Sequence, residues 1–274
     1  MNLTSPSQVK AWCIEHDFHP NKTMGQNFLI DRNALVAIVD AGLDGVPAGA
    51  PVLEIGPGLG VLTEEMVARG HPVVAIEKDP VLAERLAEAL GNPPNLTVCA
   101  GDALDLIKDG SCDGFPALVS NLPYQAGTRI MLELARRPQA RPETMTVLVQ
   151  TEVAERLAAG PGGKTRGLAG VWTQLDYTVT CVRKVPPTCF WPQPTIGSMI
   201  VSLVRHHLHD DLPAAVRDMF ARLTKQAFEH RRKQLGAIFK GVIESTARAE
   251  QLSVDDWIAI SADLVDAASR ASTA

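Results

Sequence analysis

The 274-residue sequence lacks any apolar run that approaches the roughly 20 residues needed to span a bilayer. Its amino-terminal residues, Met-Asn-Leu-Thr-Ser, also lack the basic flank and apolar stretch of a secretory signal peptide. We therefore expect a cytoplasmic protein without a membrane partner.

Cysteine pairs at metal-binding or redox spacing are absent as well. The five cysteines form no Cys-x-x-Cys motif and have no histidine partners at zinc-finger spacing. No base or co-ligand lies near them in the sequence to activate a thiol. Reduced, mostly buried thiols and no metal site are therefore expected.

Without repeats or low-complexity tracts, and with 46% hydrophobic residues, the chain has the composition of a globular protein with one sizeable core and a smaller second one.

The charge of the chain is unevenly distributed. Its formal net charge is -5, which on its own argues against a nucleic-acid partner. Residues 129–240, however, contain 17 Lys and Arg against 9 Asp and Glu, whereas the remainder contains 9 against 22. The basic half is a candidate surface for phosphate groups. Charges that merely solvate different helix faces would give the same totals, so this pattern gains weight only beside a site.

Predicted strands and helices alternate along the first half. Short apolar runs bounded by turn residues predict strands at 51–55, 72–76, 96–100, 117–120 and 146–150, and helical periodicity predicts helices at 62–69 and 81–90. This alternation predicts an α/β fold with a mainly parallel sheet and helices on both faces. Residues 171–182 and 199–204 are richer in β-branched side chains. They are expected to close the sheet as an antiparallel pair.

The pattern changes beyond Arg205. A polar stretch at 206–211 precedes a proline and then apolar residues at helical spacing, namely Met219, Phe220, Leu223, Ala227 and Phe228. We predict a boundary near residue 207, which separates a first domain at 1–206 from a small helical domain at 207–274. The Pro- and Gly-rich segments 160–164 and 185–188 are interpreted as functional loops of the first domain.

The strongest local signal is a glycine-rich turn at the end of a predicted strand. Residues 52–60 read Val-Leu-Glu-Ile-Gly-Pro-Gly-Leu-Gly. Glycines there let the backbone turn sharply and let a ligand approach where a Cβ would clash. A dinucleotide fingerprint would need a third small residue at Val61. The spacing Glu-x-Gly-x-Gly-x-Gly from Glu54 instead resembles the first motif of S-adenosylmethionine-dependent methyltransferases.

Acidic residues follow the next two predicted strands. Glu77 ends the second strand, where its carboxylate can accept hydrogen bonds from both hydroxyls of a ribose. Asp102 follows the third strand, where it can accept a hydrogen bond from an adenine amine. Either acid alone would be interpreted as a solvated strand end. Three such features at successive strand ends favour an S-adenosylmethionine site.

After the fourth predicted strand, residues 121–124 read Asn-Leu-Pro-Tyr. An adenine N6 amine is a poor nucleophile, so an enzyme must hold it in line with the methyl donor and accept hydrogen bonds from its protons. The side-chain oxygen of Asn121 and the carbonyl of Leu122 can accept these bonds. Pro123 would fix the turn, and Tyr124 can stack on the base. No strong base is required, because the proton becomes acidic as the N–C bond forms. Asn-x-Pro also occurs in ordinary turns, but its position beside the predicted cofactor site favours catalysis.

Together with residues 22–31, which read Lys-Thr-Met-Gly-Gln-Asn-Phe-Leu-Ile-Asp, these motifs resemble the ribosomal RNA adenine N6,N6-dimethyltransferase family of the KsgA/RsmA type. The resemblance extends from about residue 22 to about residue 235 and includes segments at 152–157, 161–164, 185–192 and 227–233. It implies a Rossmann-like methyltransferase domain at 1–206, an RNA-binding helical domain at 207–274 and S-adenosylmethionine as cofactor. The implied cofactor contacts are Asn27, Leu29, Gly56, Gly58, Glu77, Asp102 and Asn121.

The resemblance also implies roles in RNA binding. Tyr124 and Phe190 would sandwich the target adenine, although Phe190 after two prolines is also compatible with a core position. A charged triplet expected on a helix is a candidate for phosphate contacts, and such triplets are more often a solvated helix face. With a lysine from the Pro-Gly-Gly-Lys loop, the candidate RNA contacts are Lys164, Arg231, Arg232 and Lys233.

The sequence departs from the family pattern in several loops. Residues 125–128 read Gln-Ala-Gly-Thr where Asn-Ile-Ser/Thr is usual after the tyrosine. Thr151 replaces a usual lysine, Arg166 replaces a usual tyrosine, and residues 192–197 read Pro-Gln-Pro-Thr-Ile-Gly instead of Pro-Pro-Pro-Lys-Val-Asp. These positions are not expected cofactor contacts. They belong to loops expected to face RNA, so they bear on target choice and on rate.

The leading hypothesis is a monomeric enzyme of ribosome biogenesis. It would transfer methyl groups from S-adenosylmethionine to two adjacent adenines near the 3′ end of small-subunit (16S) ribosomal RNA, within an immature small subunit and with the base presented extrahelically. A large-subunit adenine methyltransferase of the antibiotic-resistance type is one alternative, which the Pro-Gly-Gly-Lys loop and the longer C-terminal region disfavour. A weakly catalytic, RNA-binding ribosome assembly factor is another, motivated by the altered loops. A nicotinamide oxidoreductase shares only the fold, and Val61 argues against it.

Overall fold

The computed structural model describes residues 1–137 and 140–273, and the chain packs into two compact units. Unit 1 comprises Met1–Ala154 and Thr180–Arg205, and unit 2 comprises Glu155–Val179 and His206–Ala274. The boundary predicted near residue 207 lies beside the border between Arg205 and His206. Residues 155–179, which we expected in the first domain, pack with the second unit instead.

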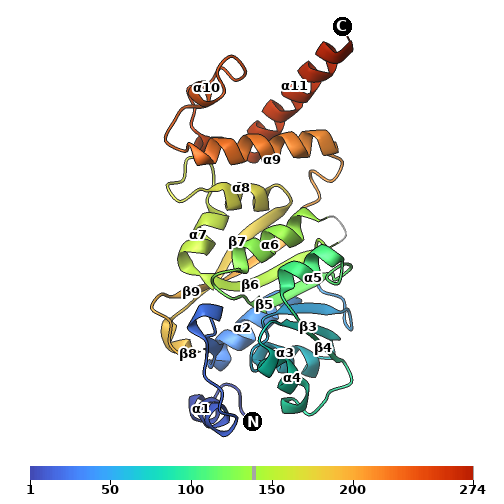
Figure 1. Cartoon of the computed structure of the whole chain (residues 1–274), viewed down its shortest axis with the longest axis vertical. Coiled ribbons are helices and arrows are strands. Elements are labelled where there is room, and N and C mark those ends of the chain that lie inside the picture. The colour runs from blue at the N-terminus through green and yellow to red at the C-terminus, as the bar shows by residue number, and fades with distance from the viewer. Residues whose placement is uncertain (138–139, 274) are drawn as a thin grey trace. The chain divides into compact units, whose positions relative to one another are not determined.

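Unit 1 is built on a mixed sheet with the strand order β4-β3-β2-β5-β6-β9-β7 (Figure 1). Neighbouring strands from β4 to β6 pair in parallel, and β9 pairs antiparallel with β6. The predicted α/β fold with a mainly parallel sheet is confirmed. The strands are β2 (Val52–Ile55), β3 (Val73–Glu77), β4 (Leu96–Ala100), β5 (Ala117–Asn121), β6 (Thr144–Gln150), β7 (Tyr177–Val185) and β9 (Ser198–Arg205).

The sequence explains why these strands lie where they do. Every residue of β2 is buried, as the continuous apolar run of a central parallel strand requires. The antiparallel closing strand β9 is confirmed, but the strand prediction for residues 171–182 is partly wrong. Residues 171–174 belong to helix α8 (Leu168–Gln174). Val171 is fully buried among helices of unit 2, and this tertiary packing overrides its β propensity.

Aspartate caps begin three helices of unit 1. The side chains of Asp31, Asp79 and Asp102 accept hydrogen bonds from backbone N–H groups in the first turns of α2, α4 and α5. Asp102, a predicted cofactor contact, is therefore also an N-cap. The helices of residues 1–154 are α1 (Pro6–Glu15), α2 (Arg32–Leu43), α3 (Val61–Ala68), α4 (Pro80–Ala89), α5 (Ala103–Asp109) and α6 (Gly127–Arg136). Helix α7 (Thr151–Ala158) begins in unit 1 and continues into the segment assigned to unit 2.

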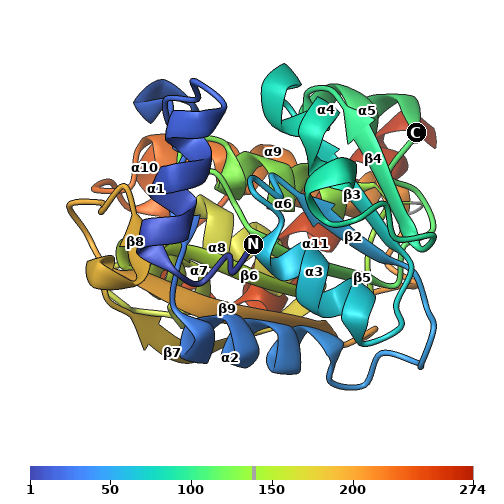
Figure 2. The ribbon, with the colours of Figure 1, turned by 90° about the horizontal axis from the view of Figure 1, so that it is seen from below.

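Helix α2 packs along β5, β6 and β9 (Figure 2). The approach is close at Gly42, where a Cβ would lie 3.0 Å or less from both γ-methyl groups of Val119.

Two short strands lie outside the main sheet: β1 (Phe28–Leu29) pairs antiparallel with β8 (Phe190–Trp191). Trp12 of α1 contacts Phe18, which contacts Phe28, so an aromatic series joins the amino-terminal helix to β1.

Unit 2 is helical. Helix α9 (Ala214–Glu229) packs on α11 (Val254–Thr273) and on α8, and its core includes Phe220, Leu235 and the fully buried Trp257. The apolar spacing that predicted α9 is confirmed. A short helix, α10 (Leu235–Ile238), lies between α9 and α11 in the sequence.

The basic triplet at 231–233 does not lie on a helix as predicted. Helix α9 ends at Glu229, and the triplet follows in a turn before α10. The turn brings Leu235 into the core, where its N–H donates to the carbonyl of Ala247 at 2.8 Å. Burial of this leucine explains why the chain leaves the helix despite residues with good helix propensity.

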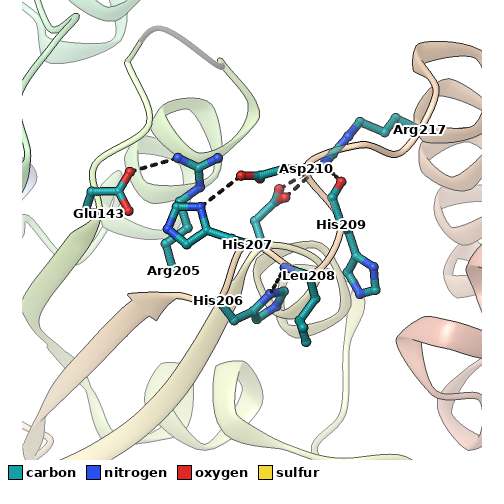
Figure 3. A network of polar contacts seen from close by, with 9 residues as sticks. Glu143, Arg205, His206, His207, Leu208, His209, Asp210 and Arg217 are labelled. Atoms are coloured by element: carbon teal, nitrogen blue, oxygen red, sulfur yellow. Dashed lines mark hydrogen bonds and ion pairs between the residues drawn. The ribbon is translucent and has the colours of Figure 1, made fainter.

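The connection between β9 and α9 is ordered by side-chain hydrogen bonds (Figure 3). In unit 2, Arg217 binds the carboxylate of Asp176 at 3.1 and 3.3 Å and also donates to the carbonyl of His209. The ring of His207 is 2.9 Å from the carboxylate of Asp210. The contact between Arg217 and Asp176 ties the segment 155–179 to α9, which explains why that segment packs with unit 2.

Candidate active site

A cavity of about 570 Å³ lies at the carboxyl ends of β2, β3, β4 and β5 in unit 1. Ligands of open α/β sheets bind at this edge, and the volume suits a small-molecule cofactor. Residues 23–29 form a further wall. The cavity is lined by all of the predicted cofactor contacts, Asn27, Leu29, Gly56, Gly58, Glu77, Asp102 and Asn121.

The glycine-rich turn after β2 requires its glycines. Gly56, Gly58 and Gly60 have φ values of 71°, 59° and 90°, in the left-handed region that favours glycine. A Cβ at Gly58 would lie 3.1 Å from two ring carbons of Phe28, and one at Gly60 would lie 2.6 Å from a methyl group of Leu86. The turn can therefore approach β1 and α4 this closely only with glycine.

Glu77 is tied to this turn. One carboxylate oxygen accepts the N–H of Gly58 at 3.0 Å, and the other accepts the N–H of Asp79 at 2.9 Å. The side chain is buried, and burial raises the pKa of Glu77 above its ordinary value. Each oxygen retains a lone pair for a hydroxyl donor. The geometry thus suits the predicted contact with two adjacent hydroxyls.

Asp102 presents a charged acceptor on the same wall. Its carboxylate accepts the N–H of Leu104 at 2.9 Å and the ammonium group of Lys78 at 2.9 Å. The hydrogen bond from Lys78 holds the pKa of Asp102 below its ordinary value. The group is therefore ionised at neutral pH and can accept a further hydrogen bond from an amine.

The amide of Asn121 has a defined orientation. Its Nδ2 atom donates to the carbonyl of Asn27 at 3.1 Å, and the amide of Asn27 donates in turn to the carbonyl of Gly25 at 3.1 Å. Because only the nitrogen of an amide can donate, the Oδ1 atom of Asn121 remains an acceptor. The loop at 25–27 therefore sets which atom of Asn121 is available for chemistry.

Tyr124 lines the cavity, whereas Phe190 is not among its lining residues. The hydroxyl of Tyr124 is 2.7 Å from the Oγ atom of Ser198, and burial raises the pKa of Tyr124. Phe190 is 2% exposed, lies in the core of unit 1 and pairs with Leu29 across the short strands. The structure thus brings one of the two predicted stacking residues to the site.

Two further polar groups line the cavity, Glu54 and Gln26, and neither was among the predicted site residues, although the glycine motif begins at Glu54. Glu54, in the cavity wall, is 1% exposed and accepts the hydroxyl of Thr63 at 2.6 Å. Burial raises its pKa to about 8, so it is a neutral acid at pH 7. Gln26 donates to the buried Asp79 at 2.8 Å and ties the loop at 23–29 to α4. The motif that drew attention to Glu54 carried no signal of its protonation.

The predicted RNA-binding residues all lie in unit 2. Lys164, Arg232 and Lys233 are exposed. Arg231 is partly buried and donates to the backbone carbonyl of Lys164 at 2.6 Å, so it supports the loop that carries this lysine. Arg166, which replaces the tyrosine usual in the family, is fully buried. Its guanidinium group donates to the carbonyl of Ala159 and to the side-chain oxygen of Gln174.

Within residues 1–137 and 140–273, no cluster of three His, Cys, Asp or Glu side chains is arranged to hold a metal ion. None of the helices in this described part of the chain combines the length and hydrophobicity of a membrane span. Cys13, Cys112 and Cys189 are buried thiols, and Cys181 is exposed.

Comparison with known proteins points to the same family as the sequence motifs at the cavity. A family model described as ribosomal RNA adenine dimethylase matches residues 17–270. The ribosomal RNA small subunit methyltransferase A of Mycobacterium avium (strain 104) is 37% identical over 281 residues, covering 94% of this chain and 87% of the relative. The protein of the same name from Chlamydia abortus (strain DSM 27085 / S26/3) is 36% identical over 273 residues, covering 94% and 96%.

Solved structures share the fold. A dimethyladenosine transferase from Plasmodium falciparum is similar with a TM-score of 0.71 and 24% identity, covering 85% of this chain and 95% of that one. The 23S rRNA methyltransferase ErmE is similar with a TM-score of 0.65 and 25% identity, covering 86% and 98%. The family predicted from the sequence motifs is confirmed: this chain belongs to the ribosomal RNA adenine dimethylase family.

Proposed function

We propose that this protein transfers methyl groups from S-adenosylmethionine to the N6 atoms of two adjacent adenines near the 3′ end of small-subunit (16S) ribosomal RNA. The observation that carries the proposal is the Asn121 amide, whose oxygen is left as an acceptor beside the cavity at the carboxyl ends of the parallel strands. The names of the relatives from Mycobacterium avium and Chlamydia abortus favour the small subunit over the large one.

The cavity residues fit S-adenosylmethionine by their chemistry. Glu77 offers two acceptor oxygens for ribose hydroxyls, and Asp102 offers an ionised acceptor for the adenine amine. The backbone of Gly56 and Gly58 leaves no side chain between the turn and a ligand. Asn27 and Leu29, which also line the cavity, would contact the cofactor from the loop at 23–29. When bound, the cofactor supplies an electrophilic methyl group on a sulfonium.

The chain's own residues would then present the base. The Oδ1 atom of Asn121 and the carbonyl of Leu122 accept hydrogen bonds from the adenine amine, which aligns its nitrogen with the methyl group. Pro123 holds the turn, and Tyr124 stacks on the base. Histidine and cysteine are missing from the described residues that line the cavity. This composition agrees with a reaction that needs positioned acceptors rather than a strong base.

In this proposal the enzyme acts as a monomer in the cytoplasm on immature small subunits. Lys164, Arg231, Arg232 and Lys233 would contact phosphates, with Arg231 acting partly through the loop that it supports. Phe190 is buried and is not among the residues that line the cavity, so Tyr124 carries the stacking role in this proposal.

The test is transfer of labelled methyl from S-adenosylmethionine to immature small ribosomal subunits, followed by digestion and separation of the nucleosides. We expect dimethyladenosine with the wild type and a loss on the order of 100-fold with Asn121→Ala, because positioned donors and acceptors contribute factors of this size. Calorimetry of S-adenosylmethionine binding shows whether the variant still takes up cofactor.

The substrate arms separate the remaining hypotheses. Methyl transfer to large-subunit RNA but not to small subunits would contradict the proposed target. It would favour 23S rRNA, which the name of the similar ErmE structure gives as that enzyme's substrate. Cofactor and subunit binding without any methyl transfer would contradict catalysis and favour the assembly factor.

A further inference from the structure

The ring of Tyr124 is held at its far end by the closing strand of the sheet. Its hydroxyl is 2.7 Å from the Oγ atom of Ser198, which lies 74 positions later and is 1% exposed. Ser198 is the first residue of β9 and pairs with Gln150 at the end of β6. The hydroxyl of Tyr124 is therefore anchored to the main sheet.

The backbone end of the same residue is also fixed. A Cβ at Gly25 would lie 3.4 Å from the backbone nitrogen of Tyr124, and one at Gly56 would lie 3.5 Å from the ring of Pro123. The carbonyl of Pro123 accepts the N–H of Gly127 at 2.8 Å, which closes the turn. With its backbone confined in this way, the side-chain torsions are the remaining freedom of Tyr124.

A second contact supports Ser198. Both the backbone N–H and the hydroxyl of Thr151 donate to the carbonyl of Gly197, at 3.1 and 3.0 Å. Gly197 directly precedes Ser198, so Thr151 holds the chain where β9 begins. Thr151 and Gly197 are both departures from the motif pattern of the family, and the structure places them in contact with each other.

We propose that Ser198, supported by Thr151, is a positioning residue that holds the ring of Tyr124 in one orientation for stacking on the target base. The inference rests on the proposed function, in which Tyr124 stacks on an adenine. An unanchored ring at a cavity wall would populate several rotamers, and the base would have to select one of them. The hydrogen bond to Ser198 removes this cost before RNA binds.

A double-mutant cycle tests the inference. Ser198→Ala and Tyr124→Phe each remove one partner of the hydrogen bond while keeping the aromatic ring. We expect each variant to lower kcat/KM for immature small subunits about tenfold, since misorientation of a reacting group has effects of this order or larger. The affinity for S-adenosylmethionine should stay unchanged. The double variant should be no slower than the slower single variant, because both remove the same interaction.

The matched control is Ser261→Ala. Ser261 is a buried serine of α11 in unit 2, and its hydroxyl donates to the carbonyl of Trp257 at 2.6 Å. This variant also removes a buried serine hydroxyl, one that bonds within its own helix, so it controls for the serine-to-alanine change away from the cavity. Its kcat/KM should remain at the wild-type value.

A spectroscopic measurement judges the anchor without relying on activity. The sequence contains only two tyrosines, Tyr124 and Tyr177. Incorporation of 3-fluorotyrosine should therefore give two fluorine NMR signals, and Tyr124→Phe identifies them. Ser198→Ala should shift or broaden the signal of Tyr124 and leave that of Tyr177 in place, and Ser261→Ala should move neither.

Several results would overturn the inference. An unchanged Tyr124 signal in Ser198→Ala would do so whether or not methyl transfer is detected. So would a Ser198→Ala rate within twofold of the wild type, or a double variant whose loss is the product of the single losses. A wild type that binds cofactor but methylates no ribosomal RNA would instead contradict the proposed function, and the fluorine spectrum would still decide on the hydrogen bond.

Discussion

The cofactor cavity of unit 1 and the basic residues of unit 2 use polar groups in different ways. In the cavity, Glu77, Asp102 and Asn121 are each held by hydrogen bonds to neighbouring backbone or side-chain groups. In unit 2, Arg232 and Lys233 are exposed in a turn. Fixed, partly buried groups suit the alignment of reacting atoms, whereas exposed charges suit attraction of a polyanion. The difference predicts that substitutions in unit 1 change chemistry and cofactor binding, and that those in unit 2 change the salt dependence of RNA binding.

The largest effect is expected from Gly58→Ala. Gly58 has φ of 59°, its N–H donates to Glu77, and a Cβ there would press on the ring of Phe28. The backbone strain should lower stability, whereas displacement of the turn from Glu77 and from the cavity should lower the affinity for S-adenosylmethionine about 100-fold, which corresponds to about 3 kcal/mol. Calorimetric titration measures this change directly.

Gly70→Ala is the matched control for this glycine. Gly70 has φ of 86°, and a Cβ there would have open space around it. The variant carries the same backbone strain without the crowding, so its thermal unfolding midpoint should fall while its cofactor affinity stays at the wild-type value. Equal cofactor affinity in both variants would contradict the structural role assigned to the glycine turn.

A smaller effect should follow from Arg232→Gln and Lys233→Gln. Each variant removes one exposed positive charge, so affinity for small ribosomal subunits should fall a few-fold at low salt. The slope of log affinity against log salt concentration should decrease in magnitude by about 1 for each variant. Binding measured over a salt series checks this. Lys10→Gln, a change at another exposed lysine on α1, should leave the slope as in the wild type, and equal slopes in all three variants would argue against a phosphate-binding role for Arg232 and Lys233.

The last prediction concerns the neutral acid in the cavity wall, and it is a change in stability rather than in binding or catalysis. Burial raises the pKa of Glu54 from 4.5 to about 8, so between these values the folded state holds a proton that the unfolded state has released. The free energy of unfolding therefore falls as pH rises through this window, by up to about 1.4 kcal/mol per pH unit. Glu54→Gln removes this ionisation, and its stability relative to the wild type should increase from pH 5 to pH 8.

Thermal unfolding midpoints at several pH values would measure this change. Burial also raises the pKa of Glu77, so part of the decline should persist in the Glu54→Gln variant. Glu84→Gln, an exposed change on α4, should follow the wild type in parallel. A Glu54→Gln curve that also runs parallel to the wild type would show that Glu54 is ionised in the folded state.

Much of unit 1 was predictable because its signals are local. The alternation of apolar runs and helical periods predicted where strands and helices follow one another along the chain. The glycine turn indicated the edge of the sheet at which a ligand binds. A strand was predicted at residues 171–174, which are helical. The helix was missed because Val171 is buried by helices that are distant in the sequence. The turn at 231–233 was missed for a related reason, since burial of Leu235 decides where α9 ends.

The sequence by itself determined the family, the mainly parallel α/β fold and the predicted cofactor contacts that line the cavity. These follow from short motifs at strand ends, and the carboxyl ends of parallel strands necessarily meet at one edge of the sheet. Only the tertiary structure decided the orientation of Asn121, the neutral state of Glu54, the burial of Phe190 and the bond between Tyr124 and Ser198. Each of these depends on contacts between residues that are distant in the sequence, or on exclusion of water from a side chain. The local spacing of residues encodes neither the contacts nor the burial.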